Sequence, residues 1–394
     1  MHKYSRIFLN AIAASFAVWA FLAAFNLCGQ RKLFLNEGRE VLSDYWMPRM
    51  CIEQGYVGTP WGIANLRSCD KDEPIQIDER GVVRSTWYTD GTNKRYFTGW
   101  IDKVYPFFGI LPLMPFPATE AGGWAWTIVA GIAFLLSLCL IAKSWWPLSL
   151  VLTAPFLFNL ERGNTTWLSA ALVGVFLAWW DDEKDWKCMV AAICLAAASA
   201  MKIAPVVLGL IYFSKWRWMP VIVCAIAGLT FLLLPWLLSS DGFAGLVAMI
   251  GNASRHGTTF LRASDFGIVP VWRAVRLLLG QDVTVAWPGV DVVARLTQLF
   301  GLANMMFAIR RRDYFLLVFG MILTAGNMYY YAALYLYPVL VLDMCRSKQG
   351  NCLEIFLWFI LLCPIQIVLH GCSANQVLGD MALLSLFAVR AVIP

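Results

Sequence analysis

The sequence predicts an all-α protein that crosses a membrane many times. Of its 394 residues, 60% are hydrophobic and only 14% are charged, and the mean hydropathy is +0.64. Soluble domains are nearer to half apolar and a quarter charged. Long apolar runs recur along the whole chain, whereas the period-two alternation of strands is absent. Together these observations favour a polytopic bundle of membrane helices.

The apolar runs divide the chain into about 10–13 candidate transmembrane helices, several of them shorter than the ~20 residues of a perpendicular span. Short helices broken at proline, as near Pro205, are typical of membrane proteins that build a cavity. The first run follows Lys3 and Arg6, and we interpret it as an uncleaved anchor. The expected spans are 7–27, 123–142, 147–160, 165–180, 188–201, 203–213, 219–238, 287–309, 314–326, 331–343, 353–369 and 376–392.

The distribution of basic residues predicts the orientation of these spans. With the N-terminus in the cytoplasm, one set of basic residues between spans falls consistently inside, as the positive-inside rule requires. They are Lys143, Lys184, Lys187, Lys215, Arg217, Arg310, Arg311, Arg312, Arg346, Lys348 and Arg390. We therefore expect a single integral membrane domain, 1–394, in the cytoplasmic (inner) membrane, with its active site on the external or periplasmic face.

Two long segments lie outside the membrane in this topology. The first external loop is 28–104, in which a Cys51–Cys69 disulfide is one alternative. The second is 239–286, in which 267–280 has the pattern of an interfacial amphipathic helix or of a helix that caps the bundle. The run 104–117 is apolar but rich in proline, and we expect a re-entrant or interfacial segment there.

Several classes of function are disfavoured by the motifs. The chain has no phosphate-binding glycine loop, nucleophile elbow or Cys-x-x-Cys pair. With only three histidines and no His-x-x-x-His pair, we expect no metal site. The net charge of +6 is spread over short loops, which is not a nucleic-acid-binding pattern. What remains is a set of polar groups that the topology gathers on the external side.

The first of these groups is Asp44, soon after the first span. It could be a helix N-cap or a solvated loop acid. It could instead be a carboxylate held over a membrane-facing cavity, where it would act as a general base.

The second group is the sequence ERGN, 161–164, between two apolar runs. Glu161 and Arg162 could be a solvated turn in which the two charges neutralise each other. Against that, the turn is very short, and Asn164, Thr165 and Thr166 are good N-terminal caps for the next helix. The free N–H groups of a helix start suit an anion.

Two further groups are basic. Lys202 interrupts two apolar helices, and it either snorkels to headgroups or binds a lipid phosphate. Asn252, Arg255 and His256 lie with Arg262 in a polar stretch of the second external loop. That stretch is either ordinary loop or a site in which arginine forks hold a diphosphate or a sugar.

The last group is aromatic. Five tyrosines lie within 325–338, and Tyr329 and Tyr330 stand at the expected external start of a helix. An aromatic belt at the membrane surface explains much of this pattern. A platform on which a sugar ring stacks is the alternative.

Taken in order, these motifs resemble glycosyltransferase family 87, whose members use polyprenyl-phosphate sugars and have the GT-C membrane fold. The resemblance covers roughly 40–345 and is best over 155–240. It is carried by Asp44, the GTPW motif 58–61, YPFF 105–108, ERGN 161–164, KIAP 202–205, KWRW 215–218, GNAS 251–254 and the tyrosine-rich start that leads to Pro338.

The resemblance implies an inverting transfer of a hexose, often mannose, from a polyprenyl-phosphate-sugar donor to a hydroxyl of a lipid or glycan acceptor. It implies no cofactor, no nucleotide sugar and no clear need for a metal. The family's proposed base corresponds to Asp44. Arg162, Lys202 and Arg255 would then bind the donor phosphate, and Glu161, Asn164, Asn252, His256, Tyr329 and Tyr330 would line the substrate site.

One departure and several alternatives remain open at this point. Mannosyltransferases of the family often carry a histidine where this chain has Tyr329 and Tyr330, which leaves mannose uncertain; Glu161 and His256 are alternative partners. The alternative functions are a transporter of lipid-linked oligosaccharides, a non-catalytic subunit that assembles an envelope polysaccharide, and a ligase that moves a whole glycan.

Overall fold

A computed structural model describes the greater part of the chain. The described residues are 3–30, 42, 44–45, 48, 86–89, 95–98, 107–117, 119–215, 217–237, 243, 246–247, 249–250, 271–272, 275–276, 279–280, 290–325, 330–346, 352–366, 368–369, 372–373 and 375–392.

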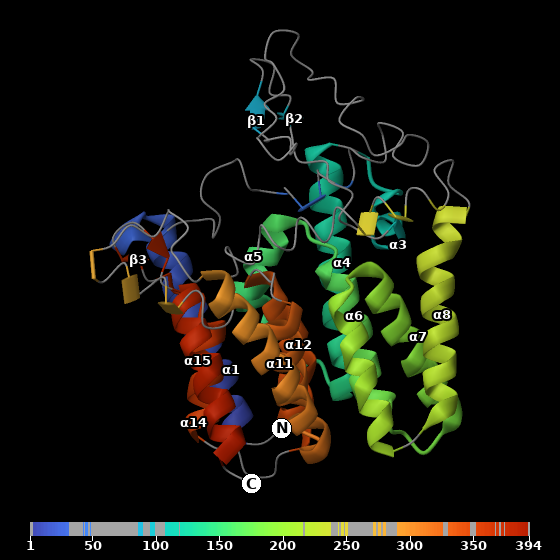
Figure 1. The fold of residues 1–394 in the computed structure, drawn as a ribbon. Coiled ribbons are helices and arrows are strands. Elements are labelled where there is room, and N and C mark those ends of the chain that lie inside the picture. The colour runs from blue at the N-terminus through green and yellow to red at the C-terminus, as the bar shows by residue number, and fades with distance from the viewer. Residues whose placement is uncertain are drawn as a thin grey trace.

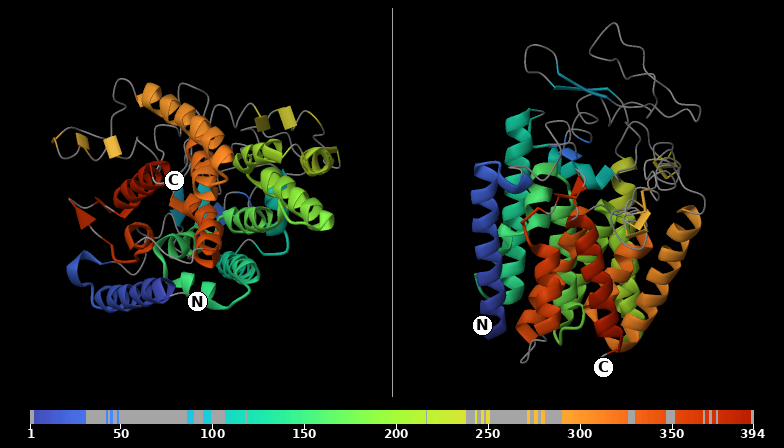
Figure 2. Two further views of the ribbon diagram at one scale, coloured as in Figure 1. Left: turned by 90° about the horizontal axis from the view of Figure 1, so that it is seen from below. Right: turned by 90° about the vertical axis from the view of Figure 1, so that its left-hand side faces the viewer.

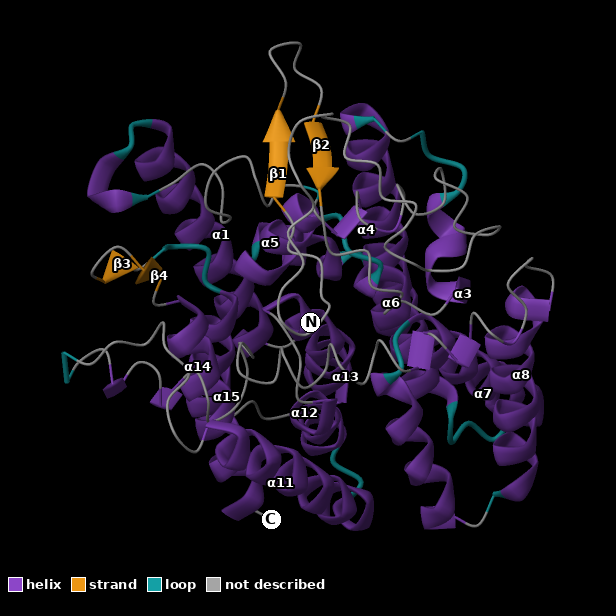
Figure 3. Ribbon diagram, turned by 45° about the horizontal axis from the view of Figure 1, so that its top comes forward, coloured by secondary structure: helices purple, strands orange, loops and turns teal. Residues whose placement is uncertain are grey.

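The described helices run roughly side by side in a bundle (Figures 1 and 2). Both chain termini lie at one end, which we call the terminal end. The strand pair β1–β2 lies beyond the other end, which we call the hairpin end (Figure 1). Figure 3, with the hairpin end turned forward, shows that helices make up nearly all of the described chain.

The elements follow the apolar runs of the sequence closely. The α-helices are α1 (Lys3–Ala24), α3 (Phe107–Ile110), α4 (Glu120–Ala142), α5 (Ala154–Arg162), α6 (Thr166–Trp179), α7 (Asp185–Met201), α8 (Trp218–Leu237), α11 (Val290–Arg311), α12 (Tyr314–Ala325), α13 (Tyr337–Arg346), α14 (Cys352–Leu362) and α15 (Asn375–Val392). The 3-10 helices are η1 (Leu27–Gly29), η3 (Leu111–Leu113), η4 (Trp146–Leu152), η5 (Ala204–Lys215) and η7 (Tyr330–Leu336).

The predicted all-α membrane fold is confirmed. Within the described residues, α1, α4, α8 and α11 are long and apolar enough to cross a membrane. Five shorter apolar helical segments accompany them, at 166–179, 204–215, 314–325, 331–345 and 352–362. The predicted break near Pro205 is present, because α7 ends at Met201 and η5 begins at Ala204.

Three predicted spans differ from the structure. The expected helix 147–160 is η4 followed by α5, with extended backbone at Thr153 between them and a proline in the first turn of α5. The expected helix 331–343 is likewise divided between η7 and α13. The expected helix 353–369 ends at Leu362, because Pro364 cannot continue it.

The structure also has two short antiparallel strand pairs that the sequence analysis did not predict. β1 (Thr86–Thr89) pairs with β2 (Arg95–Thr98), with Trp87 opposite Phe97. β3 (Val368–Leu369) pairs with β4 (Cys372–Ser373). The first pair had a signal in the sequence, since TWYT and RYFT are rich in aromatic and β-branched residues and Asp90-Gly91 lies between them.

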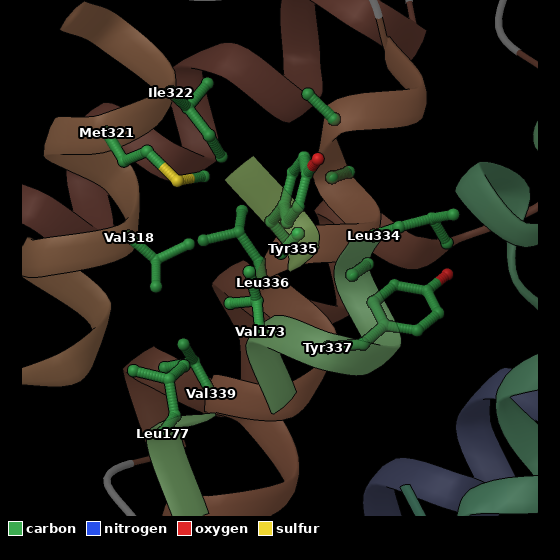
Figure 4. Close-up of a cluster of buried hydrophobic side chains, with 14 of the residues drawn as sticks. Val173, Leu177, Val318, Met321, Ile322, Leu334, Tyr335, Leu336, Tyr337 and Val339 are labelled. Atoms are coloured by element: carbon green, nitrogen blue, oxygen red, sulfur yellow. The ribbon is translucent and has the colours of Figure 1, made fainter. Parts of the chain in front are cut away.

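The core lies where α6, α12 and the η7–α13 segment meet (Figure 4). Tyr335 and Tyr337 are both buried, and the Tyr337 ring lies 5.8 Å from that of Phe134 in α4. Each phenol finds a partner: the Tyr335 hydroxyl donates to Ser169 Oγ at 2.8 Å, and that of Tyr337 pairs with the hydroxyl of Thr153. Tyrosines buried in a core need such partners, since an unpaired hydroxyl there is costly.

Arg390 of α15 gathers three carboxylates at the terminal end. Its guanidinium lies 2.6 Å from Asp343 of α13, 3.2 Å from Glu354 of α14 and 3.5 Å from Asp313, just before α12. The Arg390 side chain is 12% exposed and the three carboxylates are 20–30% exposed, so water screens these ion pairs only in part. They join four helices at one point.

α11 and α12 cross at two glycines. A Cβ built on Gly301 would lie 2.7 Å from the backbone nitrogen of Thr324 and 2.8 Å from the carbonyl oxygen of Gly320. Contacts that short require the helices to separate, because backbone atoms cannot move out of the way as a side chain can. The close approach of these two helices therefore depends on glycine.

We predict that Gly301→Ala destabilises the protein more than Gly228→Ala. At Gly228 in α8 an added Cβ would meet its nearest neighbour, Ala196 Cβ, at 3.9 Å, an ordinary contact. Both changes gain similar helix propensity, so the difference isolates the clash, which we expect to cost about 1–3 kcal/mol. Thermal unfolding of the purified protein in detergent measures it, and equal unfolding temperatures for the two variants would contradict the predicted crossing.

Candidate active site

The candidate site forms where the segment after α1 meets the turn between α5 and α6, at the hairpin end. The backbone N–H of Leu42 donates to the Glu161 carbonyl at 2.5 Å, and the Tyr45 hydroxyl donates to the Pro117 carbonyl at 2.5 Å. Leu42 and Tyr45 are fully buried. These contacts place Asp44, between them in the sequence, directly over the turn.

Two glycines make room for this segment. A Cβ on Gly123 of α4 would lie 2.8 Å from Leu42 Cδ1, and one on Gly163 would lie 2.9 Å from Tyr45 Cβ. Gly163 also has a φ of +67°, the left-handed conformation with which glycine ends many helices. Its carbonyl accepts a hydrogen bond from the Trp126 indole at 2.9 Å. The turn is therefore packed on two sides and is not a solvated loop.

Asn164 begins the next helix. Its amide oxygen accepts from the backbone N–H of Thr166 at 2.9 Å and from the Thr166 hydroxyl at 2.7 Å. We expected Asn164, Thr165 and Thr166 all to cap α6. The structure corrects this: the cap is the Asn164 side chain, while the Thr165 hydroxyl makes no capping bond and the Thr166 hydroxyl points back to Asn164.

Asp44 accepts three hydrogen bonds from this turn. Arg162 Nε lies 2.9 Å from Asp44 Oδ2, and Arg162 Nη2 lies 3.0 Å from Oδ1, so the ion pair is bidentate. Asn164 Nδ2 donates to Oδ2 at 2.7 Å. Asp44 is only 5% exposed, which excludes both the solvated loop acid and a turn in which Arg162 merely neutralises Glu161.

Lys202 stands beside this pair, in extended backbone between α7 and η5. Its ammonium lies 5.7 Å from the centre of the Tyr331 ring, within the range of a cation–π contact. The Tyr331 carbonyl in turn accepts from the Asn159 amide at 3.3 Å. Lys202 is half-buried. Because Tyr331 contacts both Lys202 and Asn159, η7 links Lys202 to α5.

The charges in the site adjust one another. Burial alone would raise the pKa of the Asp44 carboxyl, but the charge and hydrogen bonds of Arg162, the charge of Lys202 and the Asn164 amide hold that pKa below its ordinary value. Burial lowers the pKa of Lys202 to about 8; Asp44 opposes this shift and Arg162 adds to it. Asp44 is therefore ionised at neutral pH. Lys202, in contrast, loses its proton only slightly above neutral pH.

The structure thus brings together Asp44, Arg162, Asn164 and Lys202, from three separate parts of the chain. Glu161, which precedes Arg162 in the sequence, is also buried. Asn252, Arg255, His256 and Tyr329 lie outside the described residues, as do the side chain of Tyr330 and the cysteines Cys51 and Cys69. The roles predicted for them remain predictions.

Sequence reasoning missed the residues that shape the site without carrying charge. Gly123, Tyr45 and Trp126 hold the segment against the turn, and Tyr331 lies against Lys202. Gly163 alone had a usable signal, because glycine directly after the last turn of a helix is typical of a C-terminal cap. In the part of the chain that the structure describes, no three His, Cys, Asp or Glu side chains are grouped so that they could hold a metal ion.

The comparison with protein-family models assigns the chain. The model of glycosyltransferase family 87 matches residues 104–334, more than half of the 394 residues. The chain belongs to glycosyltransferase family 87. It is therefore a membrane glycosyltransferase, and the resemblance drawn from the sequence is confirmed at the family level. The searches of curated proteins and of solved structures found no match.

The matched segment of this family 87 glycosyltransferase contains Arg162, Asn164 and Lys202 but not Asp44. Asp44 lies outside the matched segment in sequence, but the fold brings it into contact with that segment. Its partners Arg162 and Asn164 lie 118 and 120 residues further along the chain.

We predict that the Asp44–Arg162 pair is strongly coupled in stability. Arg162→Met leaves a buried carboxylate without its partner, which we expect to cost about 3–5 kcal/mol of the free energy of unfolding. Adding Asp44→Asn removes the stranded charge and should recover a large part of that loss. A double-mutant cycle of unfolding in detergent at neutral pH measures the coupling.

Lys184→Met is the control for this cycle, since Lys184 is an exposed cation at the terminal end and its loss should change stability little. Strictly additive effects of the Arg162 and Asp44 changes would show that the pair is not formed.

Proposed function

We propose that this glycosyltransferase moves a hexose, with mannose as the first candidate, from a polyprenyl-phosphate-hexose donor to a hydroxyl of a lipid or glycan acceptor, with inversion at the anomeric carbon. The observation that carries the proposal is a buried carboxylate, Asp44, held between Arg162 and Asn164 with the ammonium of Lys202 beside it. A base can take the proton of the acceptor hydroxyl, and cations can stabilise the negative charge on the departing lipid phosphate.

In this proposal the reaction is a single displacement. The acceptor oxygen attacks the anomeric carbon, and its proton passes to the Asp44 carboxylate. The bond from the anomeric carbon to the phosphate oxygen breaks, and the polyprenyl phosphate leaves with an additional negative charge. Asp44 is a weak base, but a hydroxyl becomes acidic as its oxygen bonds to carbon, so the proton can move late in the step.

Lys202 and Arg162 act on the leaving group. Arg162 contributes its charge while two of its five N–H donors hold Asp44, and Lys202 contributes a compact ammonium that suits a phosphate oxygen. Arg255 would join them as a third phosphate ligand. Glu161, Asn164, Asn252, His256, Tyr329 and Tyr330 would line the sugar and acceptor sites.

The charge distribution supports the orientation we propose. The turns that follow α4, α6, η5 and α11 lie at the terminal end, opposite the site (Figure 1). In the sequence, Lys143, Lys184, Lys215 and Arg310 lie in or next to these turns. If basic loops face the cytoplasm, the site faces the outer side of the inner membrane, where lipid-linked sugars can reach it from the bilayer.

The test is transfer of label from radiolabelled polyprenyl-phosphate-mannose to a lipid or glycan extract in proteoliposomes. We expect wild type to transfer and Asp44→Asn to lose about 100-fold or more of the rate, the contribution of a general base. Asp185→Asn is the matched control, because Asp185 is exposed at the terminal end of α7.

Equal rates for wild type and Asp44→Asn would exclude Asp44 as the base and redirect attention to Glu161. If neither mannose nor glucose is transferred from its polyprenyl phosphate by folded wild type, the proposed donor is wrong. Accumulation of intact lipid-linked sugar across the bilayer would then favour the transporter.

We also predict a pH dependence that belongs to Lys202. Its pKa is about 8, so the cation is present below that pH and is lost as pH rises through it. Asp44, whose pKa is lowered, stays ionised throughout this range. We therefore expect kcat/KM for the donor to fall above about pH 8.

Lys202→Arg supplies the control, since an arginine keeps its charge over this range. The alkaline fall should then move to higher pH even if the maximum rate is lower. An unchanged alkaline limb in Lys202→Arg would assign the titration to another group.

A further inference from the structure

Thr166 holds the Asn164 amide from two sides. The amide oxygen of Asn164 accepts from the Thr166 backbone N–H at 2.9 Å and from its hydroxyl at 2.7 Å. The amide nitrogen donates to Asp44 Oδ2 at 2.7 Å. Asn164 and Thr166 are each 1% exposed. We propose that Thr166 is a positioning residue for the reaction, which orients the Asn164 amide and thereby makes Oδ1 of Asp44 the oxygen that takes the acceptor proton.

The orientation of the amide follows from hydrogen-bond chemistry. A backbone N–H can only donate, so the side-chain atom that faces it must be the amide oxygen. The nitrogen end must then face Asp44. A reversed amide would set its oxygen against the carboxylate, and both groups would lose partners that water cannot replace in this buried place.

The Thr166 hydroxyl donates its hydrogen bond to the Asn164 side chain and not to a backbone carbonyl of the preceding turn. Threonine hydroxyls within a helix commonly donate to the carbonyl three or four residues earlier, as Thr230 does to Ile226 at 2.8 Å. Thr166 instead donates to the residue two positions earlier. Among the described residues it makes no hydrogen bond to Asp44, so we expect its effect on the reaction to pass through the Asn164 amide.

The hydrogen bond from the Asn164 amide makes the two oxygens of Asp44 unequal in the number of hydrogen bonds that they accept. Oδ2 accepts from both Arg162 Nε and Asn164 Nδ2, whereas Oδ1 accepts only from Arg162 Nη2 within the described residues. A carboxylate oxygen that already accepts two hydrogen bonds is the weaker proton acceptor. The lone pair on Oδ1 is therefore the one positioned to receive the acceptor proton.

This inference rests on the proposed function, in which Asp44 is the base. The charged groups that act on Asp44 within the described chain are Arg162, from the end of α5, and Lys202, after α7. Neither is altered in the variants below. A change in the acidity of Asp44 in those variants can therefore be attributed to the orientation of Asn164.

The experiment compares Thr166→Val, Thr166→Ala, Thr166→Ser and the control Thr230→Val in two measurements. Steady-state transfer of mannose should show a kcat about tenfold lower in the Val and Ala variants, the effect of one lost neutral hydrogen bond in a buried site. The donor KM should stay within about twofold. Thr166→Ser, which keeps the hydroxyl, and Thr230→Val should match wild type.

The second measurement needs no substrate. A hydrophobic carbodiimide reacts with protonated carboxyl groups, so the rate at which Asp44 is labelled, followed by mass spectrometry at about pH 5.5, reports its acidity. Without the hydroxyl, only the Thr166 backbone N–H still holds the Asn164 amide oxygen, so the amide is held less firmly against Asp44 and the pKa of Asp44 rises. We therefore expect labelling several-fold faster in Thr166→Val and Thr166→Ala, and unchanged in Thr166→Ser and Thr230→Val.

Wild-type kcat and wild-type labelling in Thr166→Val and Thr166→Ala would overturn the proposal. So would a serine variant that behaves like the valine variant. If wild type transfers no sugar, the proposed function fails, but the labelling still tests whether Thr166 orients Asn164. Faster labelling of Asp44 in Thr166→Val and Thr166→Ala supports that role, and unchanged labelling overturns it.

Discussion

The arrangement of the site depends on the burial of one carboxylate. An ionised Asp44 in an almost dry position is tolerable only with a partner of opposite charge and with hydrogen bonds to both oxygens. Arg162 and Asn164 meet this requirement from a turn more than a hundred residues away. These bonds consequently hold the segment after α1 against the α5–α6 turn. The hydrogen bond from the Leu42 N–H to the Glu161 carbonyl joins the same two parts of the chain.

The steric side of the same constraint lies in residues that have no charge. Gly123 and Gly163 leave the space that Leu42 and Tyr45 fill. The indole of Trp126 satisfies the Gly163 carbonyl, which a left-handed helix end leaves outside the helical pattern. A carboxylate can be aimed at a turn only if the backbone that carries it can approach the turn, and here glycine permits that approach.

Much of this could be predicted from the sequence, for identifiable reasons. Apolar runs located most of the helices within a few residues, because exposed backbone is so costly in a membrane that long apolar stretches must be helical. Asp44, Arg162 and Lys202 stood out because charges next to apolar runs are rare. The partner of Arg162 could not be predicted. Glu161 is its neighbour in sequence, but adjacent residues on a helix point about 100° apart, and the true partner is set by tertiary structure. The hairpin β1–β2 was not predicted because it lies in a polar loop, without the long apolar runs that mark the helices.

Ion pairs and hydrogen bonds connect the segment matched by the family model, 104–334, to helices outside it. Arg390, Asp343 and Glu354 all follow residue 334, yet Arg390 also reaches Asp313 inside the matched segment. Near the other end of the helices, the side-chain amide of Gln30 pairs with both backbone groups of Gln366 and so holds the end of α1 to the chain after α14. A chain cut at the limits of the family match would lose Asp44, the partner of Arg162 and Asn164, at one side. At the other side it would leave Asp313 without the countercharge it has here. The family boundary therefore marks where sequences remain comparable, and it is not a place at which this protein could be divided.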